Sequence, residues 1–371
     1  MTGTGASPME RCPSTHGLGR VHGGPDAQGA AVFDFSTNSN ACGPCPEVLA
    51  ALQRADACHY PDPLYTDLRE RLASWHRVPT WRVLLAGSAS EFIFRLTAWV
   101  VQQGGRRVWI PPHAYGDYAE AARAWQLRRV AQPGQAQLLW ACDPSSPLGQ
   151  DDPALDAIGL GEAVCVLDRA YEPLRLSGAL ALPLERLNRV WQLWSPNKAL
   201  GLTGVRAAYV IAPVGAEEAV QVLEQLCPSW PVGAHGAVLL QAWTTPSVQA
   251  WLADSLVTLR AWKARQLALC ESLGWACRPS HANFHLARPE SPQTVTALLR
   301  FLRQHDIKLR DASSFGLPGQ MRLGVLPPAS QDALRLAMQR WRLPAAPGVS
   351  GVPEALGRAG FSAPAGPGAR V

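Results

Sequence analysis

The chain has 371 residues, of which 47% are hydrophobic and 17% are charged, and its formal net charge is +5. This length exceeds one typical hydrophobic core, so we expect two subdomains of globular α/β type. Arginines alternate with apolar residues instead of forming a basic stripe, which does not indicate nucleic acid binding. No apolar run reaches membrane-spanning length and residues 1–20 lack a hydrophobic signal region, so a cytoplasmic protein is expected. Nine scattered cysteines, an odd number, are typical of free thiols in a reducing compartment.

Composition and hydrophobic periodicity divide the chain into six units. They are a flexible arm (1–21), an N-terminal segment (22–39), a large domain (40–235), linking helices (236–273), a small domain (274–343) and a disordered tail (344–371). The expected strands of the large domain are Val83–Ala86, Val108–Pro111, Leu138–Cys142, Ala163–Leu167, Arg189–Trp194 and Ala207–Ala212. Those of the small domain are Ala282–Leu286, Ile307–Arg310 and Met321–Leu326, with helices at about 291–305 and 330–342.

Residues Cys42-Gly-Pro-Cys45 have the letters of a thioredoxin-type redox motif and stand before a helical pattern at residues 46–52. They follow a loop rich in Ser and Asn, however, and not a hydrophobic strand. A tight turn is therefore the favoured interpretation, and a redox function is the minority one.

The apolar run Ala163–Leu167 is typical of a buried parallel strand and leads directly into Asp168. Sheets of this type bind ligands at the carboxyl ends of their strands. A carboxylate at that place can keep the nitrogen of a pyridine ring protonated, which makes the ring an electron sink. Tyr171 follows closely enough to reach a phenolic oxygen on such a ring. The alternative is that Asp168 only caps the next turn.

Lys198 follows the strand-like run Arg189–Trp194 and precedes a Gly-rich turn that ends at Arg206. Lysine forms Schiff bases with carbonyl groups when burial or nearby cations lower its pKa. An arginine with hydroxyl and backbone N–H donors beside it suits a phosphate dianion. Pyridoxal phosphate (PLP) carries both an aldehyde and a phosphate, so these residues predict a PLP site. The alternative is a surface lysine in a Gly-rich loop.

With the Asp168 and Lys198 segments, the sequence from His22 to about Arg342 resembles the fold-type I PLP enzymes of the aminotransferase class I and II family. The resemblance implies the aspartate aminotransferase-like fold, an α/β fold with a mostly parallel sheet in a large PLP-binding domain and a smaller C-terminal domain. It also implies PLP as cofactor, no metal ion and a homodimer in which Tyr60 reaches the phosphate of the neighbouring subunit's cofactor. Lys198, Asp168 and Tyr171 are then the catalytic residues.

Three further segments carry the resemblance. Ala86–Glu91 follows a strand, opens a helix and is similar to the family's phosphate-binding turn. Pro111–Tyr118 is similar to the segment whose aromatic residue stacks on the cofactor ring. Asp143–Gly149 is similar to an Asn- and Pro-rich turn of the family, with Ser146 in place of its asparagine, and Asn197 stands where a hydroxyl residue is usual. The implied cofactor-binding residues are Tyr60, Ser88, Ala89, Ser90, Tyr115, Ser146, Asp168, Tyr171, Ser195, Lys198 and Arg206.

The N-terminal region distinguishes two branches of the family. His22-Gly-Gly-Pro, Phe33–Asn40 and Tyr60-Pro-Asp-Pro63 together resemble the threonine-phosphate decarboxylases of cobalamin biosynthesis. Histidinol-phosphate aminotransferases share the later two elements but normally lack the early His-Gly-Gly. The resemblance implies that residues 22–39 contribute to the substrate site. The implied substrate-binding residues are His22, Gly23, Asn38, Ser146, Arg310 and Arg322.

The same residues can serve two reactions. In both, Lys198 acts as the general acid or base at carbon. If Arg322 holds the substrate carboxylate near the cofactor plane, the C–H bond breaks and transamination follows. If the arginines hold a substrate phosphate, the carboxylate can leave as CO₂. The first expectation is a threonine-phosphate decarboxylase-like enzyme of cobalamin biosynthesis, and the alternative is an aminotransferase of the histidinol-phosphate type that uses a 2-oxo acid.

Overall fold

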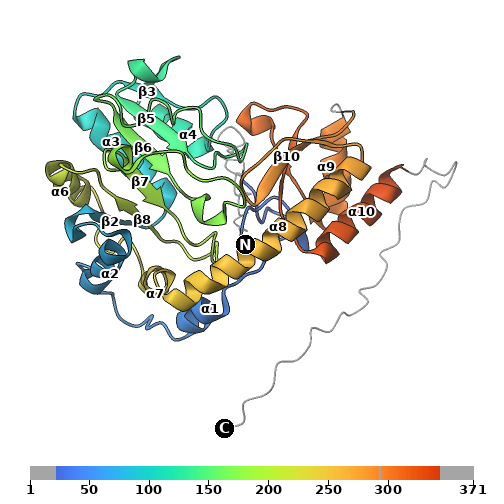
Figure 1. Cartoon of the computed structure of the whole chain (residues 1–371), viewed down its shortest axis with the longest axis horizontal. Helices are drawn as coiled ribbons and strands as arrows, with labels where there is room; N and C mark the ends of the chain where they lie inside the picture. Colours follow the sequence, from blue (N-terminus) through green and yellow to red (C-terminus); the bar gives the residue numbers. More distant parts are fainter. Residues whose placement is uncertain (1–21, 292–293, 343–371) are drawn as a thin grey trace, which may run out of the picture.

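The computed structural model describes residues 22–291 and 294–342. The expected flexible arm (1–21) and the expected tail (344–371) therefore lie outside the described residues. The described chain forms a seven-stranded sheet, a four-stranded sheet and a two-stranded one. The long helix α8 (Pro246–Ser272) runs from the seven-stranded sheet to the four-stranded one (Figure 1). No helix within the described ranges is both long and apolar enough to span a bilayer.

The larger sheet has seven strands in the order β2-β8-β7-β6-β5-β3-β4. All neighbours are parallel except that β8 runs antiparallel to both β7 and β2. Its central strands are buried on both faces, which explains their continuous apolar runs. The strands are β2 (Val83–Ala86), β3 (Arg107–Trp109), β4 (Arg128–Arg129), β5 (Leu138–Cys142), β6 (Val164–Asp168), β7 (Trp191–Trp194) and β8 (Ala208–Ile211).

Helices pack against this sheet and bury its apolar faces. Figure 1 shows α3 and α4 near its upper strands, and α2 and α7 below β2 and β8. These helices and their companions are α1 (Pro46–Gln53), α2 (Thr66–His76), α3 (Ala89–Gln102), α4 (Gly116–Ala124), α5 (Leu184–Leu187), α6 (Glu217–Gln225) and α7 (Ala234–Trp243).

The smaller sheet is antiparallel, in the order β12-β13-β10-β9. Its strands are β9 (Ala276–Cys277), β10 (Phe284–Arg288), β12 (Arg310–Asp311) and β13 (Met321–Gly324), and its helices are α9 (Val295–Gln304) and α10 (Pro328–Arg342). The N-terminal segment joins this part, because β1 (Phe33–Asp34) pairs in parallel with β11 (Ile307–Lys308). Phe35 continues the contact into the core beneath the smaller sheet.

Two segments expected from the sequence are each divided in the structure. The linking helices expected at 236–273 are α7 and α8, which are separated at Thr244–Thr245. Pro246 explains the break, because proline lacks an N–H and disfavours helix in the residue before it. The expected strand Ile307–Arg310 is likewise divided between β11 and β12, which lie in different sheets. Strands β3 and β6 begin or end one or two residues away from their expected limits.

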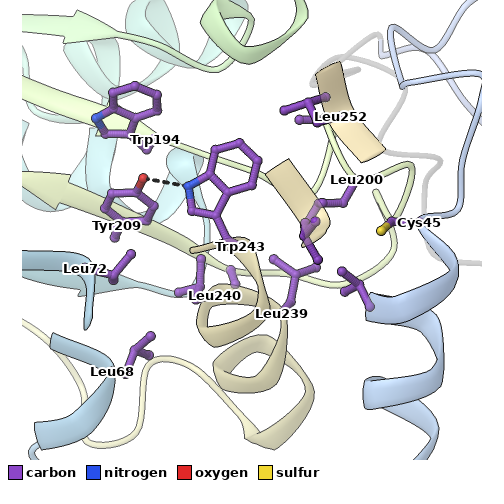
Figure 2. Packing of buried hydrophobic residues seen from close by; sticks show 14 of the residues in the cluster. Cys45, Leu68, Leu72, Trp194, Leu200, Tyr209, Leu239, Leu240, Trp243 and Leu252 are labelled. Carbon is purple, nitrogen blue, oxygen red and sulfur yellow. Dashed lines mark hydrogen bonds between the residues drawn. The ribbon is translucent and has the colours of Figure 1, made fainter. Parts of the chain in front are cut away.

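The core below β7 and β8 is organised around a buried tyrosine (Figure 2). Trp243 on α7 donates its Nε1 hydrogen to the hydroxyl of Tyr209 on β8, at 3.1 Å. The same hydroxyl lies 2.9 Å from Nε2 of His76 at the end of α2. The Tyr209 hydroxyl accepts from Trp243, so its own hydrogen is free to be donated to His76. The His76 ring must be neutral to accept that hydrogen at Nε2. Burial, with a contribution from the Arg169 charge, lowers the pKa of His76 to about 4.

This arrangement predicts a loss of stability in acid. The folded pKa of His76 lies below its ordinary value of about 6.5, so the unfolded chain binds more protons. The contribution of His76 is therefore fully present above about pH 6.5 and is lost as the pH falls toward 4. The variant His76→Gln keeps an acceptor for Tyr209 but does not titrate. Urea unfolding from pH 7 to pH 4 should show the wild type losing stability relative to this variant, and parallel curves would contradict the assignment.

Candidate active site

A cavity of about 700 Å³ lies at the carboxyl ends of the parallel strands. Cys142 and Asp168, the last residues of β5 and β6, line it together with Ser195, which follows β7. The N-terminal segment and the smaller sheet supply the remaining walls. Among the predicted site residues the cavity brings together His22, Gly23, Asn38, Ser88, Ala89, Ser90, Tyr115, Ser146, Asp168, Tyr171, Ser195, Lys198, Arg206, Arg310 and Arg322.

Asp168 is the buried acid at the floor of this cavity, with 4% of its surface exposed. Its Oδ2 accepts the hydroxyl hydrogen of Tyr118 at 2.7 Å, and its Oδ1 accepts the N–H of Ala170 at 2.9 Å. Burial raises the pKa of Asp168, whereas the Tyr118 hydrogen bond and the charge of Lys198 lower it. A carboxylate has about four acceptor sites, so Asp168 retains capacity for a further N–H donor from a ligand.

Lys198 makes no close ion pair within residues 22–291 and 294–342, and its neighbours orient its side chain. Its Nζ donates to Ser195 Oγ at 3.2 Å and lies 5.6 Å from the centre of the Tyr171 ring. The loop is held from outside by Asn40, whose backbone N–H donates to the carbonyl of Lys198 and whose Nδ2 donates to the carbonyl of Ala199, both at 2.9 Å. The half-buried amine is therefore presented to the cavity by a fixed backbone.

The Cys42-Gly-Pro-Cys45 turn forms the other side of that contact. Gly43 and Gly201 approach so closely that a Cβ on either residue would lie 2.8 Å from the other's Cα. Burial raises the pKa of both Cys42 and Cys45, the opposite of the shift in a reactive redox cysteine. The tight-turn interpretation of this segment therefore fits the structure better than the redox one.

The same cavity is lined by groups whose chemistry suits an anion. Helix α3 starts at Ala89, and the Ser88 hydroxyl accepts the N–H of Glu91 at 3.1 Å. The N–H groups of Ala89 and Ser90 have no acceptor within the helix and point toward the cavity end of α3. Arg206 is exposed in the cavity wall, and its guanidinium makes no hydrogen bond or ion pair with residues 22–291 or 294–342.

Two arginines of the smaller sheet enter the cavity side by side. Arg310 on β12 and Arg322 on β13 are register partners, and both stack on the Phe315 ring, at 4.7 and 5.4 Å. Burial, reinforced by the charge of Arg322, lowers the pKa of Arg310 to about 10. Arg322 donates to Ser146 Oγ and to the carbonyl of Ser36, each at 3.3 Å, while its buried Nε has no partner in the described chain. Two adjacent buried cations in the wall of the cavity suit an anionic ligand.

The N-terminal segment forms part of the cavity wall. A Cβ on Gly23 would lie 2.1 Å from the carbonyl oxygen of Ser36, and Gly24 has a φ of +90°, so both positions require glycine. The ring of His22 lies 6.1 Å from that of Tyr115. Asn38 donates weakly to the hydroxyl of Tyr171 at 3.4 Å, and its buried Oδ1 has no partner among the described residues.

Tyr60 is the one predicted site residue that does not line the cavity. Its side chain is 77% exposed and stacks on Trp230, with ring centres 4.4 Å apart. Its expected contact with a neighbouring subunit stays a prediction. Sequence reasoning assigned no role to Tyr118, although it lies in the quoted Pro111–Tyr118 segment. Its position one helical turn after Tyr115 was the available signal.

Comparisons with known proteins agree with this geometry. The sequence matches the aminotransferase class I and II family over residues 30–132 and 126–340. It is 26% identical over 328 residues to histidinol-phosphate aminotransferase 2 of Burkholderia mallei, covering 82% of this chain and 91% of the relative. It is 29% identical over 345 residues to the histidinol-phosphate aminotransferase of Symbiobacterium thermophilum, covering 83% and 91%.

Solved structures show the same fold. The histidinol-phosphate aminotransferase of Sinorhizobium meliloti in complex with pyridoxal-5'-phosphate superposes with a TM-score of 0.76 at 21% identity, covering 90% of this chain and 99% of that one. L-threonine-O-3-phosphate decarboxylase of Porphyromonas gingivalis superposes with a TM-score of 0.69 at 19% identity, covering 83% and 98%. The predicted aspartate aminotransferase-like fold is confirmed.

The two touching glycines give a test of how the lysine is positioned. Gly201→Ala introduces a Cβ at a φ of +71° and against the backbone of Gly43. We therefore expect the free energy of unfolding to fall by about 1–3 kcal/mol. Gly204→Ala is the matched control in the same loop, because nothing lies within 4 Å of its added Cβ. The two variants should differ in thermal unfolding and in cofactor titration, with Gly201→Ala the less stable. Equal unfolding temperatures and equal titrations would refute the packing argument.

Proposed function

Because the chain belongs to the aminotransferase class I and II family, with PLP as its cofactor, we propose that it is an aminotransferase of the histidinol-phosphate type. The substrate would be a small phosphorylated amine, and a 2-oxo acid would accept the amino group. The observation that carries this proposal is the Arg310–Arg322 pair, which lines the same cavity as Lys198 and Asp168. The names of the relatives favour this reaction over the decarboxylation that the N-terminal motifs suggested first.

The cavity residues fit the cofactor. Bound PLP supplies an aldehyde that condenses with amines and a ring that withdraws electrons from the substrate α-carbon. Asp168, with unused acceptor capacity, would hold the ring nitrogen in its protonated form. The start of α3, Ser195 and Arg206 would hold the phosphate. The unsatisfied Asn38 Oδ1 and Arg322 Nε mark places where a ligand group is expected.

The chain's own residues then divide the work. Tyr115 would cover the ring face, and Tyr171 with Asn38 would face its phenolic oxygen. Lys198 would move the proton at the substrate α-carbon as general base and acid. Arg310 and Arg322 would hold the anionic group of the substrate. Because their guanidiniums are buried among aromatic rings, that interaction is strong and geometrically selective.

The two departures from the family pattern have structural roles. Ser146 accepts a hydrogen bond from Arg322 and so helps to orient that guanidinium. Asn197 donates from Nδ2 to the carbonyl of Val205, at 3.2 Å, and thereby ties down the loop that carries Arg206. The lost hydroxyl at Asn197 leaves Ser195 as the side-chain hydroxyl nearest to Lys198 for the phosphate.

A threonine-phosphate decarboxylase-like enzyme of cobalamin biosynthesis is the second candidate, and one observation favours it. The His22-Gly-Gly segment, which distinguished this branch in the sequence, lies in the cavity wall against Ser36 and beside Tyr115. There His22 and Gly23 would contact the substrate. If the arginines hold the phosphate of O-phosphothreonine, its carboxylate is free to turn out of the cofactor plane.

A homodimer with shared sites and a cytoplasmic location stay predictions. The exposed aromatic Tyr60 and the nearby Leu64, which are 77% and 71% exposed, support an interface at this surface. Tyr60 would then complete the phosphate site of a second copy. The domain limits derived from the sequence also stay predictions, with 40–235 as the cofactor-binding domain and 274–343 as the small one.

The role of Lys198 is tested by absorbance. Lys198→Ala should remove the visible band of the protein–cofactor adduct, because Lys198 is the cavity's amine. Lys308→Ala is the control, since Lys308 pairs with Asp26 on the outer side of the N-terminal segment. Persistence of the band in Lys198→Ala, or its loss in both variants, would refute the assignment.

The reaction is tested by product analysis. The purified enzyme is incubated with histidinol phosphate and 2-oxoglutarate, and separately with O-phosphothreonine in the presence and absence of 2-oxoglutarate. Glutamate formed from histidinol phosphate is the expected result. Aminopropanol phosphate formed without an oxo acid would overturn the aminotransferase proposal in favour of the decarboxylase.

A further inference from the structure

Two cysteines and a histidine meet in the smaller part of the protein, apart from the cavity lining. Cys270 lies near the end of α8, Cys277 on β9 and His285 on β10. Their two sulfurs and a ring nitrogen all lie within 4.8 Å of one another. Cys270 and His285 are fully buried, whereas Cys277 is partly exposed on β9, the edge strand of the sheet. One member of the cluster is therefore accessible to a reagent from solution.

The protonation of His285 follows from its neighbour Gln266. The Oε1 of Gln266 accepts the N–H of Leu326, and its Nε2 donates to the carbonyl of Gly324, at 3.1 and 3.0 Å. These two backbone bonds fix the amide, so its second Nε2 hydrogen points to Nε2 of His285, 3.1 Å away. Nε2 of the histidine must accept, and the neutral ring carries its proton on Nδ1.

This tautomer argues against a metal ion and for an ionised sulfur. A metal bound at Nδ1 would require a proton on Nε2, which would face the amide hydrogen of Gln266. The Nδ1 hydrogen has no acceptor in the described chain although the ring is fully buried. A thiolate in the cluster would accept that hydrogen. Hydrogen bonding from Cys270, with a contribution from His285, lowers the pKa of the Cys277 thiol.

We propose that Cys277 and Cys270 form a thiol–disulfide modification site that takes small disulfides as its substrate. The Cys277 thiolate attacks one sulfur of the reagent, forms a mixed disulfide and releases the other half as a thiolate. Cys270 then attacks the Cys277 sulfur, loses its proton to the departing thiolate and releases the second half as a thiol. Two cysteine thiols are oxidised and one external disulfide is reduced to two thiols.

The backbone already brings the two positions together. Helix α8 ends at Ser272, and Gly274, with a φ of +73°, turns the chain so that the N–H of Trp275 donates to the carbonyl of Cys270. The bond would fasten the end of α8 to β9, which pairs with β10 and through it with β13, the strand of Arg322. The cysteine pair is thus connected to Arg322 through the pairing of neighbouring strands, although it does not line the cavity.

The experiment treats the PLP-loaded enzyme with glutathione disulfide, followed by alkylation and peptide mass mapping. We expect one peptide containing Cys270 and Cys277 to become lighter by two hydrogens. Cys270→Ser should instead trap glutathione on Cys277, and Cys277→Ser should give neither product. The exposed Cys58, changed to Ser, is the matched control and should leave the internal disulfide unaffected.

A second measurement does not depend on variants of the cysteine pair. At pH 7 we expect iodoacetamide to alkylate Cys277 about tenfold faster than Cys58, because hydrogen bonding lowers the pKa of the Cys277 thiol and the thiolate is the reactive form. His285→Gln should reduce this advantage and move the pH midpoint of alkylation upward. Modification of Cys58 alone, or zinc bound at one equivalent that protects Cys277 from alkylation, would overturn the proposal.

Discussion

The contact on which the site depends is the docking of the turn at residues 40–45 onto the loop that carries Lys198. It consists of the two hydrogen bonds from Asn40 and the approach of Gly43 to Gly201. The same segment of chain runs back through Ser36, which accepts from Arg322, to β1, which pairs with β11. One stretch of backbone thus relates the amine of the larger sheet to the arginines of the smaller one. The cavity is shaped by this stretch as much as by the sheets.

Much of the larger sheet could be predicted from the sequence, because its central strands are short apolar runs buried on both faces. Asp168 was predictable for the same reason, since it is the first charged residue after such a run. The family resemblance that placed PLP in the site rested on this residue and on Lys198, and the family match confirms it. The break between the two linking helices also has a clear local signal, which is Pro246 at the start of α8.

The smaller part was less predictable. Ile307–Arg310 has the alternation of one strand, but alternation does not specify which strand a residue pairs with. Phe33 and Asp34, more than 270 positions earlier, take the first half, and β13 takes the second. The Cys270, Cys277 and His285 cluster could not be predicted either, because it has no recognised spacing. It exists only because β9 and β10 are antiparallel neighbours beside the end of α8.

The antiparallel direction of β8 places two residues of the site, Lys198 and Arg206, on a single short connection. β7 ends at Trp194, which pairs with Tyr209 near the start of β8, so the chain leaves and re-enters the sheet at the same edge. Lys198 and Arg206 both belong to that one connection. In an all-parallel sheet the chain would have to cross to the opposite edge through a covering helix before the next strand began. Because β8 is antiparallel to β7, Lys198 and Arg206 lie on the same short loop between the two strands. The distance between them is therefore set by that loop and does not depend on how the surrounding helices pack.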